Sequence, residues 1–489
     1  MIHTQLSHRL SPISVHVKEA GEGQAFIVAS VKSPADAREA ASLLYTQIAE
    51  VLSKRGMAGV HERIFGSLSV EHDVMSARRQ AFTSFGISPE NPVTYIEGNP
   101  PWGAGLAGVI IHAVKADEVW TVMDSGVPCG RGWRRGGSTY LILQNIIYGR
   151  AIIPTNMYPK VVIPAIPNLF GSRASFREDQ KDSGQAGMTV SENPKFLNCR
   201  SNSIPRPEQA CLMIERAERI LRENGASYSD VVRTWFYLSD ILGWYAGFNK
   251  VRNEKYGEFG IMPGPGDREL LLPASTGIAG NSRAGASCAM DLIAVIGNNE
   301  NGENTLHNTL PLIPYLQGRG NNPPSPLVGE GKGEGEGEGE GEHLTKTRPS
   351  IRRLTNLSQL DAFRYGSAFA RASVVRNGST YLIEVSGTAA IDEHGVSLYP
   401  GDIRSQINCT FDKIDSLLKQ EGAELKDICS ATVFVKHGEY AETFHEMATA
   451  RGLGDFPCVC VVADVCREEL LFEIDAEAVV RREVKEEFS

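Results

Sequence analysis

The sequence lacks the features that mark several large classes of protein. Its nine cysteines are scattered and form no C-x-x-C pair, which argues against a zinc site, and their odd number argues against a disulfide framework. No run approaches the roughly 20 apolar residues that a membrane-spanning helix needs. The net charge of −10 argues against nucleic-acid binding, because such proteins carry a basic excess.

Targeting and cofactor motifs are missing as well. The start of the chain, MIHTQLSHRLSPISV, has no basic stretch followed by an apolar core, so we expect no signal peptide and a reduced, cytoplasmic protein. There is no G-x-x-x-x-G-K-[ST] phosphate loop and no H-E-x-x-H motif. We therefore predict no cofactor and no metal, and we expect neither nucleic acid nor a membrane as a partner.

The chain does contain an internal repeat. Apolar residues at the i, i+3, i+4, i+7 spacing predict an amphipathic helix, which is followed by a glycine, an aspartate and a strand. In the first copy these are 205–223, Gly225, Asp230 and 231–238, and in the second they are 402–418, Gly422, Asp427 and 428–435. The glycine and the aspartate of the second copy each lie 197 residues after their counterparts, so a duplicated unit is predicted.

A fainter third copy precedes these two, with helices predicted over 34–54 and 74–85 and strands over 61–68 and 106–114. The sequence GSTYLI occurs at 137–142 and again at 378–383, each time as a candidate first strand. Each unit then has the order β-β-α-β-α-β-β, an α+β layer with helices on one face of a mixed sheet. We predict an intramolecular pseudo-trimer whose open sheet faces pack together; the alternative is three independent domains.

Four segments are expected along the chain. They are a degenerate unit over 1–125, a second unit over 126–297, a disordered insertion over 298–350 and a third unit over 351–489. The insertion contains NNPPSPLVGEGKGEGEGEGEGE, a Gly-, Glu- and Pro-rich composition that cannot form a packed core.

The unit resembles the RidA (YjgF) family, small trimeric proteins of chorismate mutase-like fold that hydrolyse reactive imines between subunits. The resemblance is carried by FARA at 369–372, EVSGTAAI at 384–391 and FEIDAEAV at 472–479. The family's carboxylate-binding Arg, two residues after a proline, is replaced in all three units, by Thr94, Ser275 and Val459. Its catalytic Glu corresponds to Gly108, Ala289 and Glu473, so only the third unit keeps the acid.

A fused pseudo-trimer with one acid resembles a narrower family, the chorismatases. The segments that carry this resemblance are RTWFYLSDILGWYAGFNKVRNEKY from Arg233, PASTGI from Pro273, YGSAFARA from Tyr365 and DVCREELLFEID from Asp464. The resemblance implies cofactor-independent release of pyruvate from chorismate in secondary metabolism. The other product is 3-hydroxybenzoate, in part with 4-hydroxybenzoate, or a dihydroxycyclohexadiene carboxylate. It also implies a small-molecule partner, chorismate. We expect the pseudo-trimer to be monomeric or only weakly associating.

Glu473 is the predicted catalytic acid. Hydrolysis of the enol ether of chorismate begins with protonation of carbon, which needs an acid that is still protonated near pH 7. The apolar neighbours of Glu473 are suited to raising its pKa. The alternative is a structural carboxylate that accepts a hydrogen bond from a neighbouring backbone amide.

Substrate-binding residues are expected on the neighbouring unit. Strand alternation places Arg233, Trp235 and Tyr237 on one face, where Arg233 could grip a carboxylate, with a structural Arg as the alternative. Arg371 is expected to bind the second carboxylate, with Arg467 as runner-up. Thr276 is expected to hydrogen-bond substrate, and Cys466 to line the ring side or to be a buried small hydrophobe. Two alternative functions stay open, a RidA-type imine deaminase and a non-catalytic binding protein.

Overall fold

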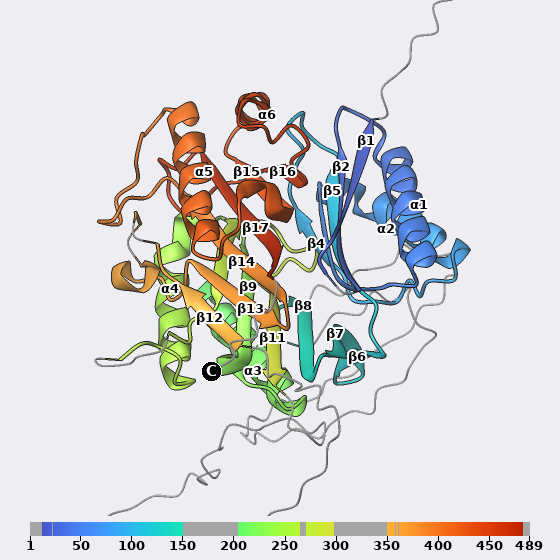
Figure 1. Cartoon of the computed structure of the whole chain (residues 1–489), viewed down its shortest axis with the longest axis horizontal. Helices are drawn as coiled ribbons and strands as arrows, with labels where there is room; N and C mark the ends of the chain where they lie inside the picture. The colour runs from blue at the N-terminus through green and yellow to red at the C-terminus, as the bar shows by residue number, and fades with distance from the viewer. Residues whose placement is uncertain are drawn as a thin grey trace, which may run out of the picture.

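Three mixed β-sheets, each with helices on one face, form the protein (Figure 1). The computed structural model describes residues 12–21, 23–149, 204–264, 270–297, 350–356, 358–359 and 361–482. The expected insertion over 298–350 lies outside the described residues except for Ser350, which begins a strand. None of the helices in the described ranges is long and apolar enough to cross a membrane.

The first sheet has the strand order β1-β2-β5-β3-β4. Its elements are β1 (Ile13–Glu19), β2 (Gln24–Val31), α1 (Ala37–Arg55), β3 (Ala58–Gly66), α2 (Glu71–Ser84), β4 (Thr94–Glu97) and β5 (Leu106–Val114). Only β3 and β4 run parallel to each other, and the other pairs are antiparallel.

The second and third sheets repeat this order with one more strand at the edge. The second comprises β6 (Glu118–Asp124), β7 (Val127–Arg135), β8 (Ser138–Ile146), α3 (Arg206–Glu223), β9 (Val231–Leu238), α4 (Ile241–Glu258), β10 (Ala274–Ala279) and β11 (Cys288–Gly297). The third comprises β12 (Ser350–Leu354), β13 (Ala372–Asn377), β14 (Thr380–Ala389), α5 (Ile403–Lys419), β15 (Ile428–Val435), α6 (Tyr440–Ala450), β16 (Cys458–Val462) and β17 (Phe472–Arg481).

Two details differ from the expectations. The repeated GSTYLI segments belong to β8 and β14, which follow a hairpin turn after β7 and β13, so they are not the first strands of their units. The strand β6 pairs with β7 in the second sheet, so this sheet begins at Glu118, before the expected boundary at 125.

The spacing between the repeated glycine and aspartate has a local cause. Gly225 and Gly422 follow α3 and α5 with φ of 75° and 63°, the left-handed conformation that favours glycine. Asp230 and Asp427 then end short 3₁₀ turns, where each carboxylate accepts the backbone N–H at the start of its turn. Each turn leads directly into a strand, which fixes the register of β9 and β15.

Apolar side chains form one core under the helices of each sheet and a further core where the sheets meet. The central core takes residues from all three sheets, among them Val28, Ile110, Trp235, Ile293, Phe434 and Val459. Figure 1 shows the helices on the outside and the sheets toward the middle. The predicted α+β pseudo-trimer is confirmed by this arrangement.

Candidate active site

A cavity of about 710 Å³ lies between the second and third units. The helix α4 and the strand β10 form one side of it. The other side is formed by the segment before β13, the end of β14, the loop before β17 and Glu473. The two units are joined at this place by backbone hydrogen bonds from Ala370 to Pro273 O and from Ala279 to Asp464 O. The cavity therefore needs both units.

Glu473 lies at the cavity wall near the start of β17 and is 4% exposed. Burial, followed by the negative charge of Asp475, raises its pKa to about 8, against the opposing effect of Arg233 and Arg371. Its carboxyl group packs against Gly387, where any side chain would overlap Oε1 of Glu473. Gly387 lies at a bulge, where the register between β14 and β17 shifts between Val385 and Thr388. Such a bulge changes the direction of the strand locally, here beside the acid.

Three arginines line the cavity. Arg371 donates from Nη2 to Tyr365 Oη at 2.8 Å. Arg467 donates to Gly395 O at 2.8 Å and so ties the loop after β14 to the cavity wall. Arg252 is buried, donates to Asn249 Oδ1 at 2.7 Å, and its guanidinium lies over three phenylalanine rings, those of Phe236, Phe248 and Phe369. The cavity is therefore suited to an anionic ligand.

Sequence reasoning missed the contribution of α4. Tyr245, Asn249, Arg252 and Asn253 all line the cavity, and their i, i+4, i+7, i+8 spacing places them on one helix face. The spacing itself can be read from the sequence, but polar, charged and aromatic residues are mixed along this helix, so it does not stand out. The bare Cα of Gly277 allows the ring of Tyr245 to approach, since an added Cβ would lie 3.3 Å from Cε2 of Tyr245.

Cys466 lines the cavity near the acid. Burial, together with the negative charge of Glu473, raises the pKa of its thiol to about 12. The side chain is therefore a protonated thiol at neutral pH, small and weakly polar, and unsuited to act as a nucleophile.

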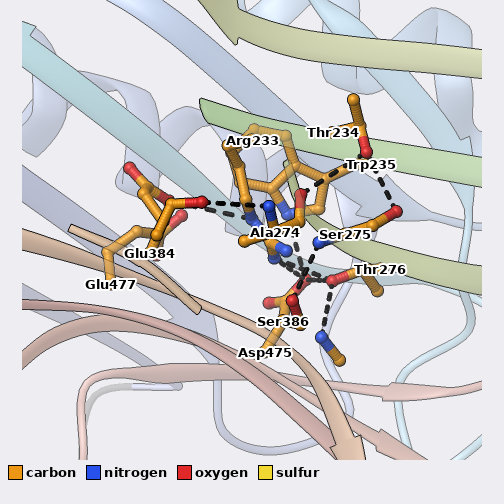
Figure 2. A network of polar contacts seen from close by, with 12 residues as sticks. Arg233, Thr234, Trp235, Ala274, Ser275, Thr276, Glu384, Ser386, Asp475 and Glu477 are labelled. Carbon is orange, nitrogen blue, oxygen red and sulfur yellow. Dashed lines mark hydrogen bonds and ion pairs between the residues drawn. The ribbon is translucent and has the colours of Figure 1, made fainter. Parts of the chain in front are cut away.

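Arg233, Trp235, Tyr237 and Thr276 do not line the cavity, so their expected contact with substrate is corrected. Arg233, Trp235 and Thr276 lie behind its wall and converge on Asp475 (Figure 2). Tyr237 packs against Phe65 in the central core. Alternation predicted the inward face of β9 correctly, but that face meets the other sheets, and all four side chains are at most 1% exposed.

Strand register aligns the three junctions between units. Three cross-strand pairs occupy the same place in the three sheets: Glu473 with Phe434, Ala289 with Tyr237, and Gly108 with Phe65. This agrees with the equivalence of Glu473, Ala289 and Gly108 predicted from the repeat. Thr94 pairs with Arg63 and Val459 with Thr432, and the equivalent pair in the second unit is Thr276 with Trp235. By strand register the counterpart of Thr94 and Val459 is therefore Thr276, one residue after the expected Ser275.

The other two junctions contain close apolar contacts at glycines, together with buried polar pairs of Asp291 with His61 and of Glu477 with Arg63. An added Cβ at Gly108 would lie 2.8 Å from Val459 Cγ2, and one at Gly280 would lie 2.5 Å from Ile96 Cγ2. The acid and the cavity thus occur together at one of the three junctions. Within the described ranges, no group of three or more His, Cys, Asp and Glu side chains is placed to hold a metal ion.

Residues 367–480 match the family model described as Endoribonuclease L-PSP. A solved structure of a chorismatase is 17% identical, with a TM-score of 0.44, and the match covers 76% of this chain and 82% of that one. A Rid protein family member from Yersinia pestis is 19% identical, with a TM-score of 0.21, and the match covers 26% of this chain and 99% of that one.

A putative endoribonuclease from Thermotoga maritima is 25% identical, with a TM-score of 0.23, and the match covers 27% of this chain and 98% of that one. The match to the family model lies within the third unit, which carries Glu473.

Proposed function

We propose that this chain is a chorismatase, which releases pyruvate from chorismate without a cofactor. The observation that carries the proposal is the buried carboxyl of Glu473, whose pKa burial raises to about 8, at the wall of a cavity lined by arginines. Protonation of the enolpyruvyl methylene carbon by Glu473 would give an oxocarbenium ion at the ether carbon. On the hydrolytic route, water would then add to that carbon, and collapse of the hemiketal would return the proton and release pyruvate. Without net water, the bond between the ring and the ether oxygen would break, so that this oxygen leaves in pyruvate, and loss of a ring proton would return the proton and make the ring aromatic.

Chorismate carries two carboxylates, and arginines from both units line the cavity. Arg371 and Arg252 approach the cavity from the third and second units, so a ligand held by both would span the junction. Arg252 takes the role that the sequence suggested for Arg233. A cavity of about 710 Å³ is within the usual range for small-molecule sites.

The second product depends on whether water is consumed. Addition of water gives pyruvate and a dihydroxycyclohexadiene carboxylate. If no water is consumed, chorismate is converted to pyruvate and a hydroxybenzoate, whose compositions add up to that of chorismate. We favour 3-hydroxybenzoate, in part with 4-hydroxybenzoate, because the small, weakly polar thiol of Cys466 is a poor group for holding and activating a water.

Incubation of the full chain with chorismate tests the proposal. Pyruvate is followed by coupled reduction with lactate dehydrogenase, and the aromatic or diene product by chromatography and mass spectrometry. Absence of pyruvate would contradict the chorismatase assignment. Turnover of an iminoacrylate in its place would support the RidA-type deaminase.

Arg252→Met should raise KM for chorismate about 100-fold with a smaller change in kcat, because a buried charged contact to a carboxylate contributes about 1.5–3 kcal/mol. Steady-state kinetics measure this, with thermal unfolding as the check on folding. Lys250→Met is the matched control, since Lys250 lies exposed at the rim of the same helix face. An equal KM increase in both variants would contradict a specific role for Arg252.

Gly387→Ala should lower kcat by about tenfold or more, because the added methyl group displaces the carboxyl of Glu473 from its place against the strand. Gly257→Ala on α4 is the control, since an added Cβ there has no neighbour within 4 Å. Rates of pyruvate release are compared at saturating chorismate. Full activity of Gly387→Ala would show that the position of the acid matters little.

A further inference from the structure

Asp475 is a second buried carboxylate close to the proposed acid. It follows Glu473 by two residues in β17, so strand alternation places both side chains on the face that points away from α5. Asp475 is 0% exposed and does not line the cavity. It therefore has no contact with a ligand, and any role in the reaction is exerted through other groups.

The carboxylate of Asp475 accepts four hydrogen bonds, and three of its donors come from the second unit (Figure 2). Its Oδ2 accepts from Thr276 Oγ1 at 2.9 Å, from Trp235 Nε1 at 3.0 Å and from Arg233 Nη2 at 3.3 Å. Its Oδ1 accepts from the backbone N–H of Thr432 at 3.2 Å. These donors hold a negative charge at a fixed place behind the cavity wall.

The same network reaches the wall on which Glu473 rests. Thr276 Oγ1 donates to Asp475 and accepts from Arg233 Nη2 at 2.7 Å and from the backbone N–H of Gly387 at 3.2 Å. Gly387 is the residue whose bare Cα leaves room for the Glu473 carboxyl. Asp475 and Glu473 are thus fixed relative to each other by one connected set of hydrogen bonds.

Charged and titratable groups reach Glu473 from several elements. They are Asp475 on β17; Arg233 on β9; Tyr245, Lys250, Arg252 and Glu254 on α4; Tyr365 and Arg371 before β13; and Cys466 and Arg467 before β17. Of these, Asp475 and Glu254 are acids, and Glu254 is exposed at the rim. Asp475 is the buried negative charge next to the acid.

We propose that Asp475 is a positioning residue that keeps Glu473 in its protonated form through a fixed negative charge held by the second unit. The proposal rests on the proposed function, for which a protonated Glu473 is the proton donor. The proposal also explains why the acid lies at a junction between units. The second unit supplies the Arg, Trp and Thr side chains that donate to Asp475, and the third unit supplies both acids. The direction of the shift agrees, since Asp475 raises the pKa of Glu473 second only to burial.

The chain contains a matched control for Asp475. Asp291 occupies the corresponding place in β11, paired with Trp235 as Asp475 is paired with Thr432. It is equally buried and is held by Thr94 Oγ1 at 2.7 Å, by His61 Nε2 at 2.9 Å and by the N–H of Asn145 at 2.7 Å. Its neighbour two residues earlier is Ala289, where no acid can respond to its charge.

The test titrates the carboxyl of Glu473 in the free protein by ¹³C NMR, with Glu473→Gln to assign the signal. Asp475→Asn should lower the titration midpoint by about one unit or more, a tenfold change in the protonation equilibrium. Asp291→Asn should leave the midpoint unchanged. Because no substrate is needed, this result does not depend on whether chorismate is turned over.

Equal shifts in both variants, or no shift in Asp475→Asn, would overturn the proposal. If Asp475→Asn does not fold, Arg233→Met/Asp475→Asn/Glu384→Gln removes Arg233 together with both carboxyl groups that lie against it, which costs less than removing one charge alone. Its midpoint should still fall, by less, because Asp475 outweighs Arg233 in its effect on Glu473. An unchanged or raised midpoint there would overturn the proposal as well. If the enzyme is active, the pH at which kcat/KM falls should be lower in Asp475→Asn, by the same amount as the titration midpoint of Glu473. In Asp291→Asn this pH should be unchanged.

Discussion

Replacing Glu473 with glutamine should lower kcat for pyruvate release from chorismate by about 10²–10⁴-fold, the usual contribution of a general acid. Glutamine has nearly the same shape and fits against Gly387, but its amide does not transfer a proton to carbon at neutral pH. The fold should be retained, because Glu473 is already neutral below its pKa of about 8. Rapid-quench or coupled assays measure the rate, and thermal unfolding checks the fold.

The pH dependence of the wild-type enzyme gives the same hypothesis a second readout. Since the acid must be protonated, kcat/KM should fall as the pH rises through about 8, the value to which burial and Asp475 raise the pKa of Glu473. Glu254→Gln, at the exposed rim, is the control and should keep both the rate and the profile. Full activity of Glu473→Gln would show that Glu473 is not the proton donor.

The architecture was predictable from the sequence because its signals are local. Gly225 and Gly422 adopt the left-handed conformation directly after a helix, and Asp230 and Asp427 end the turns that follow. Each signal depends on a few neighbouring residues, so it can be read without knowing the partner strands. The hairpin position of the GSTYLI segments was not predictable in this way, because β7 and β13 carry no comparable repeat.

The candidate site was only partly predictable. Glu473, Arg371 and Cys466 line the cavity, and each was picked out with the help of a family resemblance. The alternation of side chains along a strand correctly identified the inward face of β9. It could not show that Asp475 and Glu384, from another sheet, lie against Arg233 on that face. The face of α4 was missed because its polar residues are mixed with aromatic ones, so no clean apolar stripe marks the side that packs inward.

Arg233 is instead a buried cation at the junction of the second and third units, and Arg63 is a second cation there, 3.9 Å from Asp475. Its guanidinium lies 3.3 Å from Asp475 and 3.7 Å from Glu384, and 4.4 Å above the ring centroid of Trp235. Glu384 and Glu477 are direct cross-strand partners, and burial, followed by the charge of Glu477, raises the pKa of Glu384 to about 8. Arg233 therefore offsets negative charge that has no access to water.

Arg233→Met should lower the free energy of unfolding by about 3–5 kcal/mol, because it leaves the buried carboxylate of Asp475 without its nearest cation. Urea unfolding followed by tryptophan fluorescence measures this, and Trp235 reports directly on the junction. Arg134→Met is the control for loss of an exposed pair, that of Arg134 with Glu118, and should cost about 0–1 kcal/mol. If the two variants were equally stable, the interior network would contribute little to the assembly of the units, and Arg233 would again become a candidate for binding a carboxylate of the substrate.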